Sequence, residues 1–252
     1  MRQTRIHTSQ SLSAGQTIVL EPEPSRHLLR VLRLRQGDPV VVFADEGREY
    51  AGVIAHGDGK RCRVELGQAR DPRTESPLPL ALVQSIARGD RMDWCIQKAC
   101  ELGASRIIPV FSERTGVRLD EQRAVRRQHH WQAVAVAACE QSGRCRVPPV
   151  DRPVALDAAE LGIGRGLVLD PDGDHAPQDI EPPPDGTGLT LACGPEGGFS
   201  MAEIEFLAQR GFVRLRLGPR VLRSETAGPA ALAVLQALHG DWRPAMVGNP
   251  AT

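Results

Sequence analysis

The hydrophobic pattern of the chain changes near residue 77. Before this point, short runs of apolar and β-branched residues alternate with turn signals such as Gly37-Asp38. This pattern predicts strands joined by tight turns, at residues 17–20, 39–44 and 61–66. Residues 25–34 differ, because their leucines and valine fall on one side of a helix that Ser25 is placed to cap. The first seventy residues therefore predict a small β-barrel with one helix.

A linker is predicted at residues 71–77, and beyond it strands and helices alternate. Strands are predicted at residues 78–85, 106–111, 167–170, 189–193 and 213–217, and helices at 93–102, 123–141, 202–210 and 227–240. The continuous apolar run of 78–85 is typical of a strand covered on both faces. Residues 173–188 are rich in proline and predict a mobile surface loop. Residues 78–252 thus predict an α/β domain with a mainly parallel sheet.

Composition places few further limits. The 252 residues carry 31 Lys and Arg against 31 Asp and Glu, and 41% are hydrophobic, as in an ordinary globular protein. Residues 1–70 hold eleven of these cations and eight of the acids, a basic excess too modest to establish nucleic-acid binding. No apolar run predicts a membrane span, and the N-terminus lacks the pattern of a secretory signal. A cytoplasmic protein is the expectation.

The six cysteines predict no metal site. None forms a Cys-x-x-Cys pair, and no histidine lies at zinc-finger spacing. His129 and His130 are adjacent, so on a helix they point to different faces. We expect reduced, mostly buried thiols.

Two loops with Gly-Pro carry the strongest chemical signal. Residues 194–198 read Gly-Pro-Glu-Gly-Gly and residues 217–227 read Leu-Gly-Pro-Arg-Val-Leu-Arg-Ser-Glu-Thr-Ala. Each follows a predicted strand and precedes a predicted helix, where open α/β sheets bind ligands. The pattern is neither a Walker loop nor a dinucleotide fingerprint, and Glu196 would repel phosphate. The loops therefore predict paired walls of one pocket that suits a cationic ligand.

These two loops resemble the signature of the RsmE family, the 16S ribosomal RNA uracil-N3 methyltransferases of the SPOUT superfamily. Residues 97–103, 111–117 and 138–144 fit the same family, so the resemblance spans nearly the whole chain. It implies a SPOUT-type α/β methyltransferase domain with a trefoil knot, preceded by a PUA-like β-barrel. It also implies S-adenosylmethionine as cofactor, 16S ribosomal RNA or the small ribosomal subunit as partner, and a homodimer.

We expect the candidate site residues to have three roles. The expected cofactor-binding residues are Leu191, Gly194, Pro195, Glu196, Gly197, Gly198, Leu217, Gly218, Pro219, Leu222, Thr226 and Ala227. The expected RNA contacts are Arg30, Arg33, Arg114 and Arg144. Arg223 and Glu225 are expected to be catalytic, because uracil N3 must lose its proton before it becomes a good nucleophile. Arg223 would meet the charge that develops on O2 or O4, and Glu225 would accept the proton or orient Arg223.

Other interpretations remain open for these residues and for the function. Arg223 and Glu225 are alternatively a structural ion pair, and Ser224 and Thr226 are expected to cap the helix that follows. Trp131 is expected in the core rather than stacked on a base. The rival functions are a SPOUT methyltransferase that acts on another base or on the ribose 2′-OH, and a non-catalytic RNA-binding assembly factor.

Overall fold

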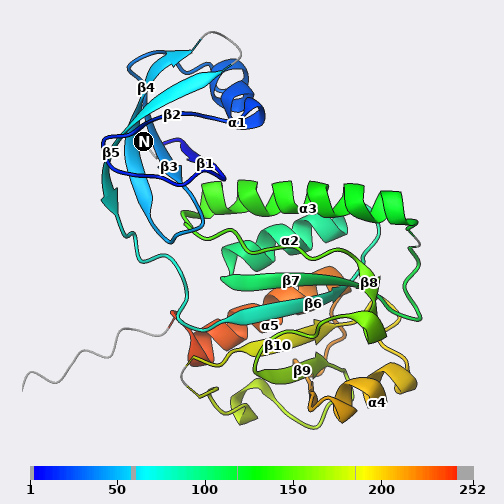
Figure 1. Ribbon diagram of the computed structural model, residues 1–252. Coiled ribbons are helices and arrows are strands. Elements are labelled where there is room, and N and C mark those ends of the chain that lie inside the picture. The colour runs from blue at the N-terminus through cyan, green and yellow to red at the C-terminus, as the bar shows by residue number, and fades with distance from the viewer. Residues whose placement is uncertain (1–2, 58–60, 118, 185, 243–252) are drawn as a thin grey trace, which may run out of the picture. The chain divides into compact units, whose positions relative to one another are not determined.

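The computed structural model describes residues 3–57, 61–117, 119–184 and 186–242, which divide into two compact units (Figure 1). The first unit comprises residues 1–75 and 136–147, and the second comprises 76–135 and 148–252. Helix α3 (Glu121–Ser142) begins in the second unit, and its last turns belong to the first. The return of residues 136–147 to the first unit has no signal in the sequence. The predicted division at residues 71–77 stays a prediction.

The first unit is built on a five-stranded sheet of order β1-β3-β4-β5-β2. Its strands are β1 (Arg5–His7), β2 (Thr17–Val19), β3 (Pro39–Phe43), β4 (Glu49–Gly57) and β5 (Cys62–Arg70). β1 runs parallel to β3, and the other pairs are antiparallel. The sequence pattern missed β4, in which Gly52 interrupts the run. That glycine is required, because a Cβ there would lie 2.8 Å from Cγ1 of Val64.

The predicted helix of the first unit is real, but its expected start was wrong. Helix α1 (Pro22–Arg26) begins three residues before Ser25 and continues into a π-helical turn, η1 (His27–Val31). A proline in the first turn needs no partner for an N–H, which suits this start. Ser25 is therefore inside the helix and fully buried. Its hydroxyl donates to the carbonyl oxygen of Leu20 (3.0 Å) and accepts from the Cys62 N–H (3.0 Å).

Replacing Ser25 with alanine should destabilise the first unit. The variant leaves the buried N–H of Cys62 without its acceptor, so we expect the free energy of unfolding to fall by about 1–3 kcal/mol. Urea unfolding followed by circular dichroism measures this loss. Ser13→Ala is the matched control, because Ser13 is exposed. Equal stability of the two variants would contradict the assigned role of the buried hydroxyl.

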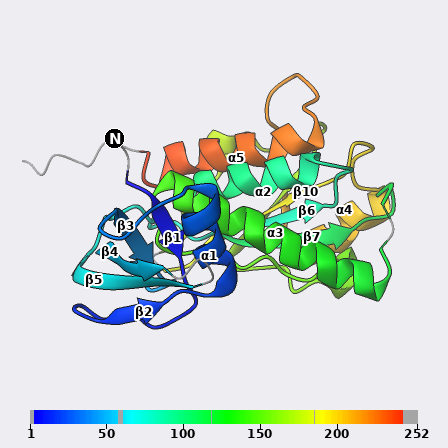
Figure 2. The same cartoon turned by 90° about the horizontal axis from the view of Figure 1, so that it is seen from above.

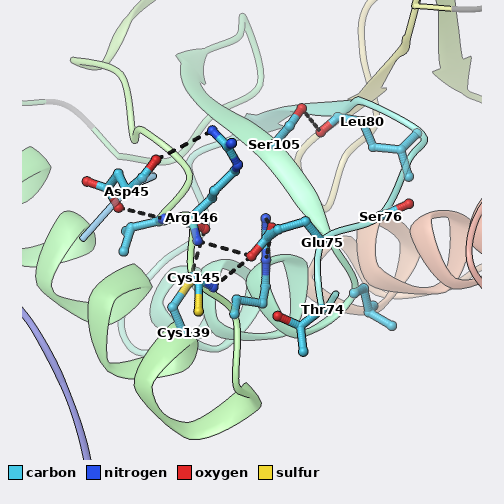
Figure 3. A network of polar contacts seen from close by, with 12 residues as sticks. Asp45, Thr74, Glu75, Ser76, Leu80, Ser105, Cys139, Cys145 and Arg146 are labelled. Carbon is cyan, nitrogen blue, oxygen red and sulfur yellow. Dashed lines mark hydrogen bonds and ion pairs between the residues drawn. The ribbon is translucent and has the colours of Figure 1, made fainter. Parts of the chain in front are cut away.

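A carboxylate network ties residues 136–147 into the first unit (Figure 3). Glu75 Oε1 accepts from the backbone N–H groups of Cys145 (2.8 Å) and Arg146 (3.0 Å). Its Oε2 accepts from Nη2 of Arg144 (2.8 Å). The side chain of Arg144 is only 7% exposed. Arg144, expected to contact RNA, is instead buried here as the partner of Glu75, and we no longer assign it to RNA.

The second unit contains a six-stranded sheet of order β11-β9-β10-β6-β7-β8, in which every pair is parallel. Its strands are β6 (Leu80–Ser85), β7 (Ala104–Phe111), β8 (Val154–Ala155), β9 (Arg165–Leu169), β10 (Leu189–Cys193) and β11 (Val213–Leu215). Besides α3, its helices are α2 (Arg91–Glu101), α4 (Met201–Gln209), α5 (Ser224–His239) and the 3-10 turns η2 (Leu156–Ala158) and η3 (Pro177–Asp179). The predicted α/β class with a parallel sheet is confirmed.

Helices cover both faces of this sheet. α2 and α5 lie side by side on one face (Figure 2), where a Cβ at Gly228 of α5 would contact Leu82 and Gln84. α4 covers the other face, and its Ile204 packs in the core formed by Ala81, Val83 and Ala192 among others. All six residues of β6 are buried, as its continuous apolar run predicted. Trp131 is also buried, which confirms its core position.

One further expectation about the second unit changes. The segment 173–188 is partly packed rather than a free loop, because His175 pairs with Leu215 and Ile180 is buried. Residue 185 of that segment lies outside the described residues. Among the described residues, no helix is long and apolar enough to cross a membrane.

Candidate active site

A pocket of about 380 Å³ lies in the second unit at the carboxyl ends of β9, β10 and β11. Its walls include residues 170–172 after β9, 194–199 after β10, and 217–222 after β11 except for residue 219. The structure thus brings the two Gly-Pro loops to one cavity, as their positions after parallel strands predicted. The wall after β9, Asp-Pro-Asp, was missed. Acidic residues at the end of a predicted strand were the signal that could have found it.

Most of the expected cofactor-binding residues line this pocket. Nine of them do so, namely Gly194, Pro195, Glu196, Gly197, Gly198, Leu217, Gly218, Leu222 and Ala227. Three others are placed elsewhere. Leu191 is buried within β10, Pro219 is an exposed residue of the loop after β11, and Thr226 is exposed in the first turn of α5.

The first loop requires glycine at specific positions. A Cβ at Gly194 would lie 2.9 Å from the backbone nitrogen of Phe199, a contact that no side-chain rotation relieves. Gly198 has a φ of 68°, in the left-handed region that favours glycine. Gly197 differs, because a Cβ there would be 3.4 Å from the Arg114 side chain, an ordinary contact. The loop therefore depends on Gly194 and Gly198 for its shape, but not on Gly197.

Neighbouring elements hold this loop from the side. Ser200 and Glu203 form a capping box that begins α4, with the Ser200 N–H donating to Glu203 Oε2 (2.8 Å). The other oxygen of Glu203 accepts from the Glu113 N–H (2.7 Å). Arg114 Nη1 donates to the carbonyl oxygen of Gly197 (2.8 Å). Arg114, expected as an RNA contact, is therefore part of the pocket wall, although its side chain stays exposed.

Arg223 and Glu225 lie where the second loop enters α5. Arg223 is the residue before the first turn, and its exposed guanidinium makes no hydrogen bond or ion pair within the described residues. Glu225 is 15% exposed, and its Oε1 lies 3.6 Å from Nε of Arg91. Its Oε2 is buried and has no hydrogen-bond partner among the described atoms. The alternative of an Arg223–Glu225 ion pair is therefore not what these described residues form.

The expected caps of α5 were wrong. The helix begins at Ser224, three residues before the predicted start, and Arg223 occupies the capping position without a side-chain hydrogen bond. Ser224 Oγ is buried without a partner in the described part of the chain. Ser224 lines the pocket instead.

Arg91 is a site residue that the sequence analysis missed. Its Nη1 lies 2.9 Å from Oε1 of Glu196, and its Nε faces Glu225. It is the first residue of α2 and follows Gly89-Asp90, just beyond the buried strand β6. Because Arg91 lies beyond the end of that strand and outside both Gly-Pro loops, the sequence around it gave no signal.

The pocket is also lined by a cysteine thiol that is unreactive at neutral pH. Cys193 ends β10 and lines the cavity, and burial raises the pKa of its thiol to about 12. Burial also raises the pKa of Cys95, which faces Gln84 of β6. Both thiols therefore stay protonated at neutral pH and are poor nucleophiles.

Arg30 and Arg33, the remaining expected RNA contacts, are exposed on the first unit. Arg33 follows η1 and has a φ of 56°, which is uncommon for a residue other than glycine. This backbone turn ends the helical segment.

Comparison with known proteins defines the class. The family model of the RNA methyltransferase domain matches residues 74–236, and the family model of the RNA methyltransferase PUA domain matches residues 20–67. Together with the parallel sheet and its pocket, these matches define an RNA methyltransferase with a PUA-like domain.

Individual relatives narrow the class to one family. The ribosomal RNA small subunit methyltransferase E of Neisseria gonorrhoeae, solved with bound S-adenosylmethionine, is 36% identical with a TM-score of 0.89, covering 96% of this chain and 100% of its own. The proteins of that name from Mycobacterium bovis and Bacillus subtilis are 31% and 28% identical, covering 90% and 93% of this chain and 89% and 96% of their own. The chain belongs to the ribosomal RNA small subunit methyltransferase E family, which confirms the resemblance read from its two loops.

Proposed function

We propose that this protein uses S-adenosylmethionine to methylate N3 of a specific uridine in 16S ribosomal RNA. The observation that carries the proposal is the pocket at the carboxyl ends of β9, β10 and β11, where both loops of the family signature meet. A relative of the same fold holds S-adenosylmethionine, and relatives are named for the small-subunit ribosomal RNA.

The residues of the pocket fit this cofactor. Its volume of about 380 Å³ falls in the range of small-molecule sites. Glycines at 194, 197, 198 and 218 leave main-chain groups open to a ligand. Asp172 places a carboxylate at the wall, which suits the sulfonium and ammonium charges, while Glu196 and Asp170 are paired with Arg91 and Arg214 (2.9 Å each). When bound, S-adenosylmethionine supplies an electrophilic methyl group.

The two expected catalytic residues have complementary roles in the proposal. Glu225 accepts the N3 proton at its buried, unpartnered Oε2, so the uracil ring becomes an imide anion. Arg223 has a guanidinium that is exposed beside the pocket-lining Leu222, and it meets the negative charge on a uracil oxygen. Neither step needs a metal ion, because the proton passes to a carboxylate and the charge is met by an arginine.

Finer features of the family are part of the same proposal. We propose residues 1–70 as an RNA-binding PUA-like barrel, 71–77 as a linker and 78–252 as the SPOUT domain. Arg30 and Arg33 would contact RNA. A trefoil knot in the SPOUT domain is proposed from the family alone. A homodimer is likewise proposed from the family alone.

Nucleoside analysis of the product tests the function. Purified protein is incubated with labelled S-adenosylmethionine and small subunits or 16S ribosomal RNA that lack the modification. We expect 3-methyluridine at one position, and no label in RNA treated with a Gly194→Val variant. A 2′-O-methylated nucleoside or another methylated base would favour the first rival. Cofactor or RNA binding without any methylation would favour the assembly factor.

A further inference from the structure

Arg91 joins the two halves of the candidate site. It lies at the start of α2, outside both signature loops, yet its guanidinium contacts a carboxylate from each side. Nη1 lies 2.9 Å from Glu196 Oε1 in the loop after β10, and Nε lies 3.6 Å from Glu225 Oε1 in the first turn of α5. The guanidinium of Arg91 therefore bridges Glu196, which belongs to a loop that lines the pocket, and Glu225, the residue proposed to accept the proton.

The contact with Arg91 places the two carboxylate oxygens of Glu225 in different surroundings. Oε1 faces Arg91, whereas Oε2 is buried and has no hydrogen-bond partner among the described atoms. A buried carboxylate oxygen without a donor is costly, so it calls for one from a ligand or water. The N3–H of a uracil is such a donor.

The remaining neighbours of Glu225 give it no charge partner. Cys95 of α2 and Cys193 of β10 lie close enough for its charge to oppose their ionisation, and both thiols are buried and neutral. Gln84 of β6, which contacts Cys95, is uncharged. Within the described residues, Arg91 alone forms an ion pair with Glu225.

We propose that Arg91 is a positioning residue that turns Glu225 so that Oε2 faces the N3–H of the target uracil. Its second contact, to Glu196, links this orientation to the loop at residues 194–198. The inference rests on the proposed function, in which Glu225 is the proton acceptor. Arg91 acts through Glu225 and needs no contact with the substrate.

A double-mutant cycle tests this role. Arg91→Gln, Glu225→Gln and the double variant are assayed by single-turnover methylation at saturating S-adenosylmethionine, and cofactor affinity is measured by calorimetry. Arg91→Gln should lower the rate roughly 10–100-fold, the scale for misplacing a reacting group, with cofactor affinity changed only a few-fold. In the Glu225→Gln background the same change should cost less than about 3-fold, because the residue it positions is already lost.

Two further variants sharpen the test. Arg152→Gln is the matched control, because Arg152 forms an ion pair of 3.0 Å with Glu121 and is 45% exposed, close to the 43% of Arg91. The Arg152→Gln variant should methylate at the wild-type rate. Arg91→Lys keeps the charge but not the two-sided fork, so its rate should lie between those of the wild type and Arg91→Gln. Thermal melts establish that each variant is folded. If Arg91→Gln does not fold, Arg91→Lys replaces it in the double-mutant cycle.

The outcomes separate this inference from the proposed function. If the rate of the double variant falls by the product of the two single-variant losses, the two residues act independently, and the positioning role of Arg91 is overturned. An Arg91→Gln enzyme with weakened cofactor binding but a normal rate at saturation would also overturn it, and would assign Arg91 to the pocket alone. Failure of the wild type to form 3-methyluridine would instead overturn the proposed function itself.

Discussion

Arg223→Ala is expected to slow methyl transfer by roughly 10²–10³-fold while S-adenosylmethionine affinity stays within a few-fold, the scale for losing one oxyanion-type donor. The guanidinium is exposed beside the pocket and makes no hydrogen bond or ion pair within the described residues, so its loss should not disturb the fold. Negative charge reaches the uracil oxygens only as N3 loses its proton. Ground-state binding should therefore barely change.

Single-turnover methylation and calorimetry measure these two effects separately. Arg216→Ala is the matched control, because Arg216 is an exposed arginine that precedes the same loop and does not line the pocket. It should retain the wild-type rate. Normal turnover of Arg223→Ala would remove Arg223 from the mechanism and leave only positioning by the loops.

The sequence predicted the parts of this site that are continuous along the chain. The loops after β10 and β11 were recognised because glycine and proline have unusual backbone preferences that are readable one residue at a time. Their convergence followed from a general rule for parallel strands. The strand β6 was recognised because burial on both faces replaces the alternation of apolar and polar residues with a continuous apolar run, here ending in the buried Gln84 and Ser85.

The missed features depend on contacts between distant residues. Arg91 meets Glu196 and Glu225 only after the sheet has formed, so its sequence neighbours give no sign of these two ion pairs. The pairing of Glu75 with Arg144 likewise brings together segments about seventy residues apart. For this reason Arg144, which the sequence suggested as an RNA contact, is buried as the partner of Glu75. The knot proposed for the SPOUT domain would be still less visible, because hydrophobic periodicity reports which face of an element is buried and not the path of the chain.

Gly194→Val is expected to weaken S-adenosylmethionine binding by at least about 100-fold, because overpacking a rigid contact typically costs 1–3 kcal/mol and a β-branched side chain adds to this. The first added carbon would lie 2.9 Å from the Phe199 nitrogen and 3.2 Å from the carbonyl carbon of Gly198. Both are backbone atoms, so the clash can be relieved only by moving the loop at residues 194–199. That loop forms one wall of the pocket.

Alanine substitutions at two positions of this loop isolate the cause. Gly194→Ala and Gly197→Ala add the same methyl group, but the Cβ at 194 meets backbone whereas the Cβ at 197 meets only the flexible Arg114 side chain at 3.4 Å. Calorimetric titration should show a roughly 10–100-fold loss for Gly194→Ala. Gly197→Ala should bind within a few-fold of the wild type. Equal affinities for the two variants would mean that the backbone shape of this loop does not determine cofactor binding.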